Sequence, residues 1–493
     1  MNRPPEKTLS DHNQHSVRQN PEAPSNFIVR FNGGMEKILQ TCIAFGLSVC
    51  LRFFPKFLVK YRFAFEKLMK SQAVKNTLML MISNGFLGLF AIATQILVTN
   101  TLGRTLFGQY ASYMAIGTYG ACIVRYGRER TMVRDIIQHP GDFERIFCGT
   151  VILSLILAVA FNIGLLFFAF FSNMPMSISL WLVVTANILI SFDLQPVYDS
   201  WRQMGKHATY FLIRRLLEYT PIWILVLSAP FLLSINYIAT VAILASLFVL
   251  YFQYHEVIKG EHTRIFCKQN WFAACHQLRE NFEIALGTFL LLFIGPTIQL
   301  FLKRTHGPSE VGIYAAALQI LLIINFVFSQ LSRIGRPAMA RVTLPEVSRR
   351  EKRTAVFQYA LVMFLTSFPL AFPMFFFPKW IVGVFFKPEF AEAAHILPIL
   401  AIYNIVLAQG MVFVQYIQSA RHDRLYSFGV FGGAALSFIF GFTIIPWYGL
   451  SGAAWSLLIA HGFSIFLYAM ITLYSLYFRP DASFAGSVDV QKY

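Results

Sequence analysis

Residues 95–116, QILVTNTLGRTLFGQYASYMAI, align without a gap on residues 299–320, QLFLKRTHGPSEVGIYAAALQI, at an offset of 204 positions. Seven of the 22 aligned positions are identical in the two segments. Both copies also share the spacing G-x4-G-x-Y, which apolar composition alone does not produce. The alignment therefore indicates an internal duplication of the chain.

Each copy joins the end of one apolar run, a short turn and the start of the next run. The first copy has Gly103 and Gly108 in this turn, and the second copy has Gly307 and Gly312. Glycine is needed where φ is positive or where another backbone approaches closely. We expect these conditions at the glycines of both turns.

Apolar runs of 18–26 residues recur from residue 73 onward, and such runs are long enough to cross a bilayer as helices. The chain is 56% hydrophobic and only 13% charged, and its 51 Phe residues suit a lipid-facing surface. We predict an all-α polytopic membrane protein of about twelve transmembrane helices. The spans are expected near residues 75–99, 107–125, 146–171, 178–198, 212–231, 236–254, 284–302, 311–331, 355–377, 395–416, 427–445 and 449–473.

These spans divide into two parallel six-helix repeats. Each repeat has an even number of spans, so both enter the membrane from the same side, an arrangement found in alternating-access transporters. The predicted domains are a disordered polar tail (1–34), a basic amphipathic interfacial segment (35–72), an N-lobe (73–254), a cytoplasmic linker (255–283), a C-lobe (284–474) and a cytoplasmic tail (475–493).

The net charge of +17 follows the membrane topology. With the N-terminus inside, 36 of the 41 Lys and Arg residues fall on the cytoplasmic side, as the positive-inside rule requires. This distribution places both termini in the cytoplasm and removes the reason to expect a nucleic-acid partner.

Catalysis and metal binding find little support in the sequence. The predicted loops are too short to fold alone, so we expect no enzyme and no catalytic residue. Cys267 and Cys275 lie in one loop with His262 and His276, but their spacing matches no standard zinc pattern. We therefore expect neither a metal site nor a cofactor.

Four stretches resemble the polysaccharide (O-antigen-type) flippases of the multidrug/oligosaccharidyl-lipid/polysaccharide flippase superfamily. They are LGRTLFGQY (102–110), FDLQPVYDSWRQMGKHATY (192–210), GPSEVGIYAAA (307–317) and PWYGLSGAAWSLLIAH (446–461). The resemblance covers about residues 73–475, whereas the first 72 residues depart from the family pattern, which leaves open whether Met35 is the true start.

The resemblance implies a central cavity between two six-helix lobes in the bacterial cytoplasmic (inner) membrane. It implies transport of a polyprenyl-pyrophosphate-linked oligosaccharide from the cytoplasmic to the outer leaflet. The expected partners are membrane lipids, this lipid-linked oligosaccharide and a glycan polymerase or another glycan-synthesis protein. The alternatives are a cation-coupled multidrug exporter, a membrane-embedded glycan polymerase or ligase, and a non-transporting scaffold.

Charged side chains inside a membrane are costly and therefore mark candidate sites. Arg214 and Glu218 lie four residues apart, so we expect them to pair and to leave Arg215 free for a pyrophosphate. Arg125 is a further substrate-path candidate. An alternative is that these charges anchor helix ends at the headgroups.

Other polar residues suit ion coupling or sugar binding. Asp193, Glu218 and His461 are the candidates for coupling to protons or sodium, although Asp193 could instead pair with an Arg and His461 could be a core histidine. Side-chain amides match sugar hydroxyls but also join helices to one another. The amides chosen as substrate-path candidates are Asn84, Gln319, Asn325, Asn404 and Gln409.

Overall fold

The computed structural model describes residues 72–171, 177–201, 203–261, 267–343, 347–420 and 423–477. The chain divides into two units, Met1–Ile82 and Ser83–Tyr493, and all contacts below lie within the second. The predicted tail 1–34, the interfacial segment 35–72 except its last residue, and most of the tail 475–493 lie outside the described residues.

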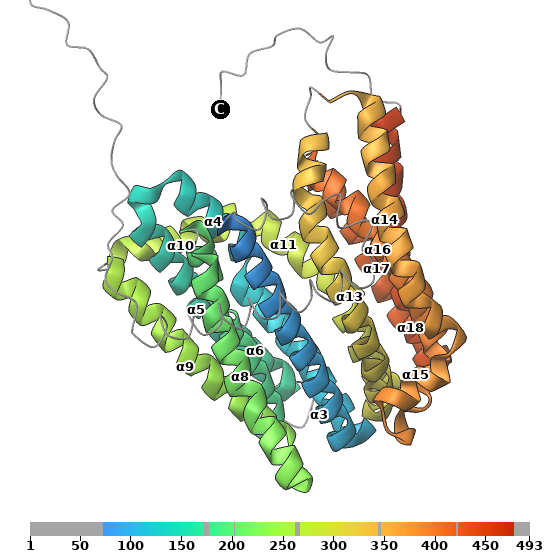
Figure 1. Cartoon of the computed structure of the whole chain (residues 1–493). Coiled ribbons are helices and arrows are strands. Elements are labelled where there is room, and N and C mark those ends of the chain that lie inside the picture. Colours follow the sequence, from blue (N-terminus) through green and yellow to red (C-terminus); the bar gives the residue numbers. More distant parts are fainter. Residues whose placement is uncertain are drawn as a thin grey trace, which may run out of the picture. The chain divides into compact units, whose positions relative to one another are not determined.

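Helices are the only regular elements in these described ranges, apart from four short 3-10 turns (Figure 1). The N-half contains α3 (Gln72–Arg125), α4 (Arg128–Gln138), α5 (Phe143–Phe171), α6 (Ile178–Ile190), α7 (Gln195–Ser200), α8 (Met204–Ser228) and α9 (Ile235–Glu261). The linker contains α10 (Lys268–Glu280). The C-half follows with α11 (Phe282–Leu291), α12 (Pro296–His306), α13 (Pro308–Val342), α14 (Arg349–Phe376), α15 (Pro378–Phe385), α16 (Ala393–Ser419), α17 (Asp423–Thr443) and α18 (Ile445–Tyr477).

The polytopic helical prediction is confirmed. Within the described part, eight helices are long and apolar enough to cross a membrane, and the pair α11–α12, bent by 41°, would make a ninth span. The other predicted spans fall in α3, whose 54 residues include a break at Gly103, and in α8. The structure is therefore consistent with the twelve predicted spans.

The first glycine of each repeat copy has the positive φ that the sequence predicts. Gly103 has φ 74° and Gly307 has φ 88°. Gly103 bends the chain between the two arms of α3, and Gly307 separates α12 from α13. These values lie where a side chain would strain the backbone, which explains why both copies have glycine.

The second glycine of each copy permits a close backbone approach, as predicted. A Cβ added to Gly108 would collide with the carbonyl oxygen of Pro308, and one added to Gly312 would collide with that of Arg104. Each carbonyl lies four residues before the glycine of its own copy. The two copies therefore pack on each other symmetrically, backbone against backbone.

Polar contacts continue this packing between α3 and the C-half, which we call the seam. The Gln319 Nε2 group donates to the Thr99 hydroxyl at 2.8 Å. The Asn100 amide donates to the Phe385 carbonyl at 2.8 Å and accepts from the Lys387 N–H at 2.9 Å. The seam therefore combines backbone packing with specific hydrogen bonds.

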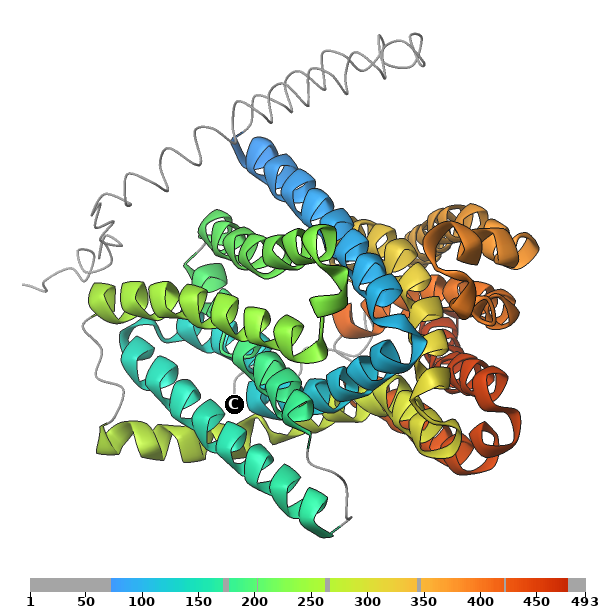
Figure 2. The ribbon, with the colours of Figure 1, turned by 90° about the horizontal axis from the view of Figure 1, so that it is seen from below.

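The surface is apolar where lipid is expected. α14 exposes Phe364, Phe368, Phe372 and Phe376, which follow one another at intervals of four residues along one helix face. The polar and small side chains instead lie between helices, and α16, α17 and α18 lie side by side (Figures 1 and 2). Apolar side chains on the outside and polar side chains between the helices are the arrangement that a lipid bilayer requires.

Candidate functional site

A break between α6 and α7 organises the first polar network. Arg128, at the start of α4, donates from Nη2 to the carbonyl oxygens of Ser191 and Asp193, the latter at 2.9 Å. Its side chain is buried, and burial lowers the pKa of this guanidinium. Arg128 thus satisfies two carbonyls that the break leaves without helical partners.

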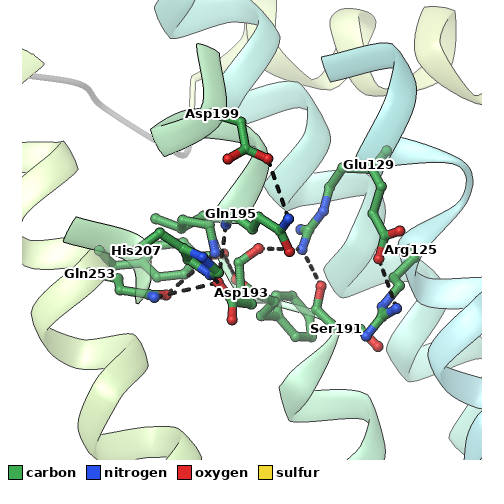
Figure 3. A network of polar contacts seen from close by, with 12 residues as sticks. Arg125, Glu129, Ser191, Asp193, Gln195, Asp199, His207 and Gln253 are labelled. Carbon is green, nitrogen blue, oxygen red and sulfur yellow. Dashed lines mark hydrogen bonds and ion pairs between the residues drawn. The ribbon is translucent and has the colours of Figure 1, made fainter. Parts of the chain in front are cut away.

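The Asp193 carboxylate lies in the same network (Figure 3). Its Oδ1 contacts His207 Nε2 at 2.9 Å and accepts hydrogen bonds from the Gln195 N–H at 3.0 Å and Gln253 Nε2 at 3.4 Å. Sequence reasoning considered an arginine as its partner and did not identify His207. Its role in ion coupling remains a prediction.

A second acidic centre ties α7 and α8 to α9. Glu256 on α9 pairs with Lys206 and accepts hydrogen bonds from the hydroxyls of Tyr210 at 2.8 Å and Tyr198 at 3.3 Å. The sequence analysis did not single out Glu256, because its position just after the predicted span 236–254 looks like an ordinary helix terminus. This centre fixes the start of α8.

The predicted ion pair within α8 is wrong. Glu218 pairs with Arg215, not with Arg214, at 3.0 Å between Oε2 and Nη1. Arg215 also donates to the Tyr219 hydroxyl at 2.8 Å. Residues three apart and residues four apart are both neighbours on a helix, so Glu218 can reach either arginine. Tyr219 lies one turn after Arg215 and gives this arginine a second partner.

Arg214 is therefore the arginine that is left without a hydrogen-bond partner. It is 5% exposed, and among the described residues its guanidinium makes no hydrogen bond or ion pair. Its Cζ atom lies 5.3 Å from the centroid of the Phe211 ring. Asp193 and Glu218 are near enough to attract this charge, but neither pairs with it, so the guanidinium has hydrogen bonds to offer to an anionic ligand.

Aromatic side chains lie one to three turns further along α8. Phe90 on α3 packs edge-on against Tyr219, at 5.6 Å between ring centroids, and stacks with Trp223 at 6.2 Å. The Trp223 indole donates to the Thr94 hydroxyl at 2.9 Å. These aromatic contacts join α8 to α3 on the side of α8 that carries Arg215.

Arg125 borders a cavity of about 360 Å³ between the N-half and α11. It pairs with Glu129 at 2.7 Å, and its side chain is 39% exposed. The volume falls in the usual range for small-ligand sites. The cavity is lined by Thr118, Ala121, Cys122, Arg125, Gly127, Glu129, Asn187, Ile190, Ile284, Thr288 and Leu292.

The predicted amides take different positions. Gln319 is buried at the seam, and Gln409 donates to a carbonyl of α14 at 3.3 Å, so both join helices. Asn404 is fully buried with both amide atoms unpaired, and the Oδ1 atom of Asn325 is also buried without a partner. The side chain of Asn84 lies outside the described residues. Sugar binding by these amides remains a prediction.

His461 lies in the interior of the C-half. Its Nδ1 atom is 3.4 Å from the Tyr403 hydroxyl, and the two rings meet edge to face.

The described residues contain no group of three or more His, Cys, Asp or Glu able to hold a metal.

Several solved structures of membrane transporters have a similar fold. One similar solved structure is an inward-facing multidrug resistance MATE family transporter of the MOP superfamily, with 13% identity, a TM-score of 0.59, and coverage of 79% of this chain and 94% of that chain. Another is a MOP superfamily transporter from Pyrococcus furiosus, with 15% identity, a TM-score of 0.52, and coverage of 80% and 93%. At these identities the likeness shows the fold alone. A search of curated proteins finds no match.

The sequence itself shows the family. The family model described as polysaccharide biosynthesis protein matches residues 73–343, more than half of the chain. The chain belongs to this family of polysaccharide biosynthesis proteins. The family agrees with the predicted role in polysaccharide synthesis, and the fold is similar to that of MOP superfamily transporters.

Proposed function

We propose that this transporter moves a polyprenyl-pyrophosphate-linked oligosaccharide from the cytoplasmic to the outer leaflet of the bacterial inner membrane by alternating access, with both termini cytoplasmic. The family description supports a role in polysaccharide synthesis. In this proposal a glycan polymerase or another glycan-synthesis protein receives the lipid-linked oligosaccharide after transport. No covalent chemistry takes place in the helical bundle.

The observation that carries the proposal is the unpaired guanidinium of Arg214. A pyrophosphate is the anionic group of such a lipid, and guanidinium binds phosphate oxygens through two parallel hydrogen bonds. Arg215 is held by Glu218 and Tyr219, so it orients the helix and leaves Arg214 to the ligand.

The drug-exporter alternative is less well supported. A cationic drug needs free carboxylates, and the two intramembrane candidates are already engaged: Asp193 contacts His207, and Glu218 contacts Arg215. The Asp193–His207 pair suits coupling to protons, because carboxylates and imidazoles form the proton relays of membrane transporters. Coupling by this pair is part of the proposal.

Binding measurements test the proposal directly. We expect Arg214→Ala to weaken binding of a short-chain polyprenyl pyrophosphate to the purified protein by about 10- to 150-fold, the effect of losing a charged hydrogen bond. Arg214→Lys should restore only part of the affinity, because an ammonium cannot bind in the two-point manner.

Two controls sharpen this experiment. Arg134→Ala removes an exposed arginine paired with Asp135 and should leave the affinity unchanged. A polyprenol without phosphate should bind the wild type and Arg214→Ala equally. Unchanged pyrophosphate affinity in a folded Arg214→Ala protein would show that phosphate recognition lies elsewhere.

A further inference from the structure

The linker between the two halves contains a helix, α10, that is held in a fixed rotation against α5. Ala273 and Ala274 are buried, and a Cβ added to Gly149 of α5 would lie 2.9 Å from that of Ala273. The Gln277 amide donates to the Ile146 carbonyl at 3.1 Å and accepts from the Thr150 hydroxyl at 3.0 Å. These contacts fix which side of α10 faces the protein.

A second face of α10 is apolar and exposed. Trp271, Cys275 and Leu278 follow one another at intervals of four and three residues, which places them in one row along α10, and the exposed Phe282 follows as the first residue of α11. Phe272 lies beside this row and is 67% exposed. A row of this kind on a surface in contact with water is unusual and marks an interaction site.

The third face is polar. His276 and Glu280 are one turn apart, highly exposed, and paired at 3.2 Å. At 3.6 residues per turn, the face docked on α5, the apolar row and this pair lie roughly 120° apart. α10 therefore has a protein side, an apolar side and a polar side.

The position of α10 in the chain identifies what meets the apolar side. α10 connects the spans α9 and α11, so it lies where both emerge on the same side of the membrane. The row continues beyond Phe282 to the exposed Leu286 of α11, a residue of the bent span. In Figure 1, α10 runs across the ends of the neighbouring spans. The apolar side is therefore continuous with the lipid-facing surface.

We propose that α10 is an interfacial helix whose apolar row is inserted into the lipid leaflet on that side, the cytoplasmic leaflet in the predicted orientation. Tryptophan is favoured at this depth, and the exposed Arg279 lies beside the row, where it can reach lipid phosphates. Because α10 is docked on α5, its insertion fixes the depth of the N-half at the point where the chain crosses to the C-half. This inference is independent of the substrate.

Fluorophores on two adjacent residues test the insertion. Full-length protein with Cys275 as its only cysteine is labelled with the environment-sensitive fluorophore NBD and reconstituted in phosphatidylethanolamine/phosphatidylglycerol vesicles. The matched control carries Cys275→Ser and His276→Cys, which moves the label about 100° around the helix. Quenching by acyl-brominated lipid and by aqueous iodide is measured for both proteins.

The proposal expects lipid quenching at position 275 and iodide quenching at position 276. Equal iodide quenching at both positions would overturn it by showing a hydrated helix. Protection of position 275 from both quenchers would overturn it by showing that protein covers the row.

A second measurement avoids the cysteine replacements. In otherwise wild-type protein, Trp271→Phe should reduce the fraction of tryptophan fluorescence that brominated lipid quenches. Trp201→Phe, which removes a ring packed on Phe143 and Tyr198, should not reduce it. An unchanged fraction in Trp271→Phe would contradict insertion of the row.

Discussion

Arg214 and Arg215 are adjacent in sequence, yet their environments differ completely. Arg215 has a carboxylate and a hydroxyl as partners, whereas Arg214 is buried without either. The sequence analysis predicted that Arg214 would pair with Glu218 and leave Arg215 free, and the structure shows the reverse. The spacing could not decide between the two arginines, since intervals of three and four residues both allow pairing. The Tyr219 hydroxyl, which accepts a hydrogen bond from Arg215, favours the pairing of Glu218 with Arg215.

The positive φ angles and the close backbone approach at the glycine pairs could be predicted, and a substitution at Gly108 tests the close approach. Gly108→Ala should destabilise the protein by about 1–3 kcal/mol or more, because the new methyl group meets the Pro308 carbonyl at a contact that cannot relax without parting the repeat copies. The measurement is the thermal unfolding midpoint in detergent.

Gly164→Ala is the matched control, because a Cβ at this position in α5 meets nothing within 4 Å. It should be neutral or slightly stabilising, since alanine favours a helix by about 1 kcal/mol over glycine. Equal destabilisation by the two substitutions would contradict the close packing at Gly108.

At the scale of elements, the spans could be predicted because their length and apolar character are local properties. The break between α6 and α7 could not be predicted in this way. The polar stretch that starts at Asp193 was visible, but its partners Arg128 and His207 come from other helices. α10 was also missed, because it lies in a segment read only as a linker.

The α6–α7 break gives a prediction for Arg128. Arg128→Ala should lower the free energy of unfolding by roughly 2–4 kcal/mol, because the carbonyls of Ser191 and Asp193 lose their donor in a buried place. Arg134→Ala on the same helix, where the arginine is exposed, should change it by less than about 1 kcal/mol. Denaturant titration of both variants measures the difference, and equal effects would exclude the capping role.

At the scale of the whole molecule, the internal duplication becomes a seam between α3 and the C-half. If transport requires the halves to separate there, a covalent link across the seam should stop it. We expect a disulfide between cysteines at Thr99 and Gln319 to abolish transport, and reduction to restore it. Transport is measured in vesicles before and after addition of a reductant.

A link within one half provides the control. Gln415 of α16 donates to the Ser332 carbonyl of α13 at 3.1 Å, so this pair joins two helices of the C-half much as Gln319 and Thr99 join the seam. A disulfide between cysteines at these positions should leave transport largely intact. Full activity of the oxidised Thr99→Cys/Gln319→Cys protein would show that the seam stays closed during transport.

The proposed function is transport of a pyrophosphate-linked oligosaccharide across the bilayer. Vesicles in which such a lipid starts in the outer monolayer test this proposal, because a transported lipid becomes protected from an added glycosidase. We expect time-dependent protection with the wild type and with Arg134→Ala, and its loss with Arg214→Ala. Protection no greater than in protein-free vesicles, while the same vesicles accumulate a cationic drug, would contradict it.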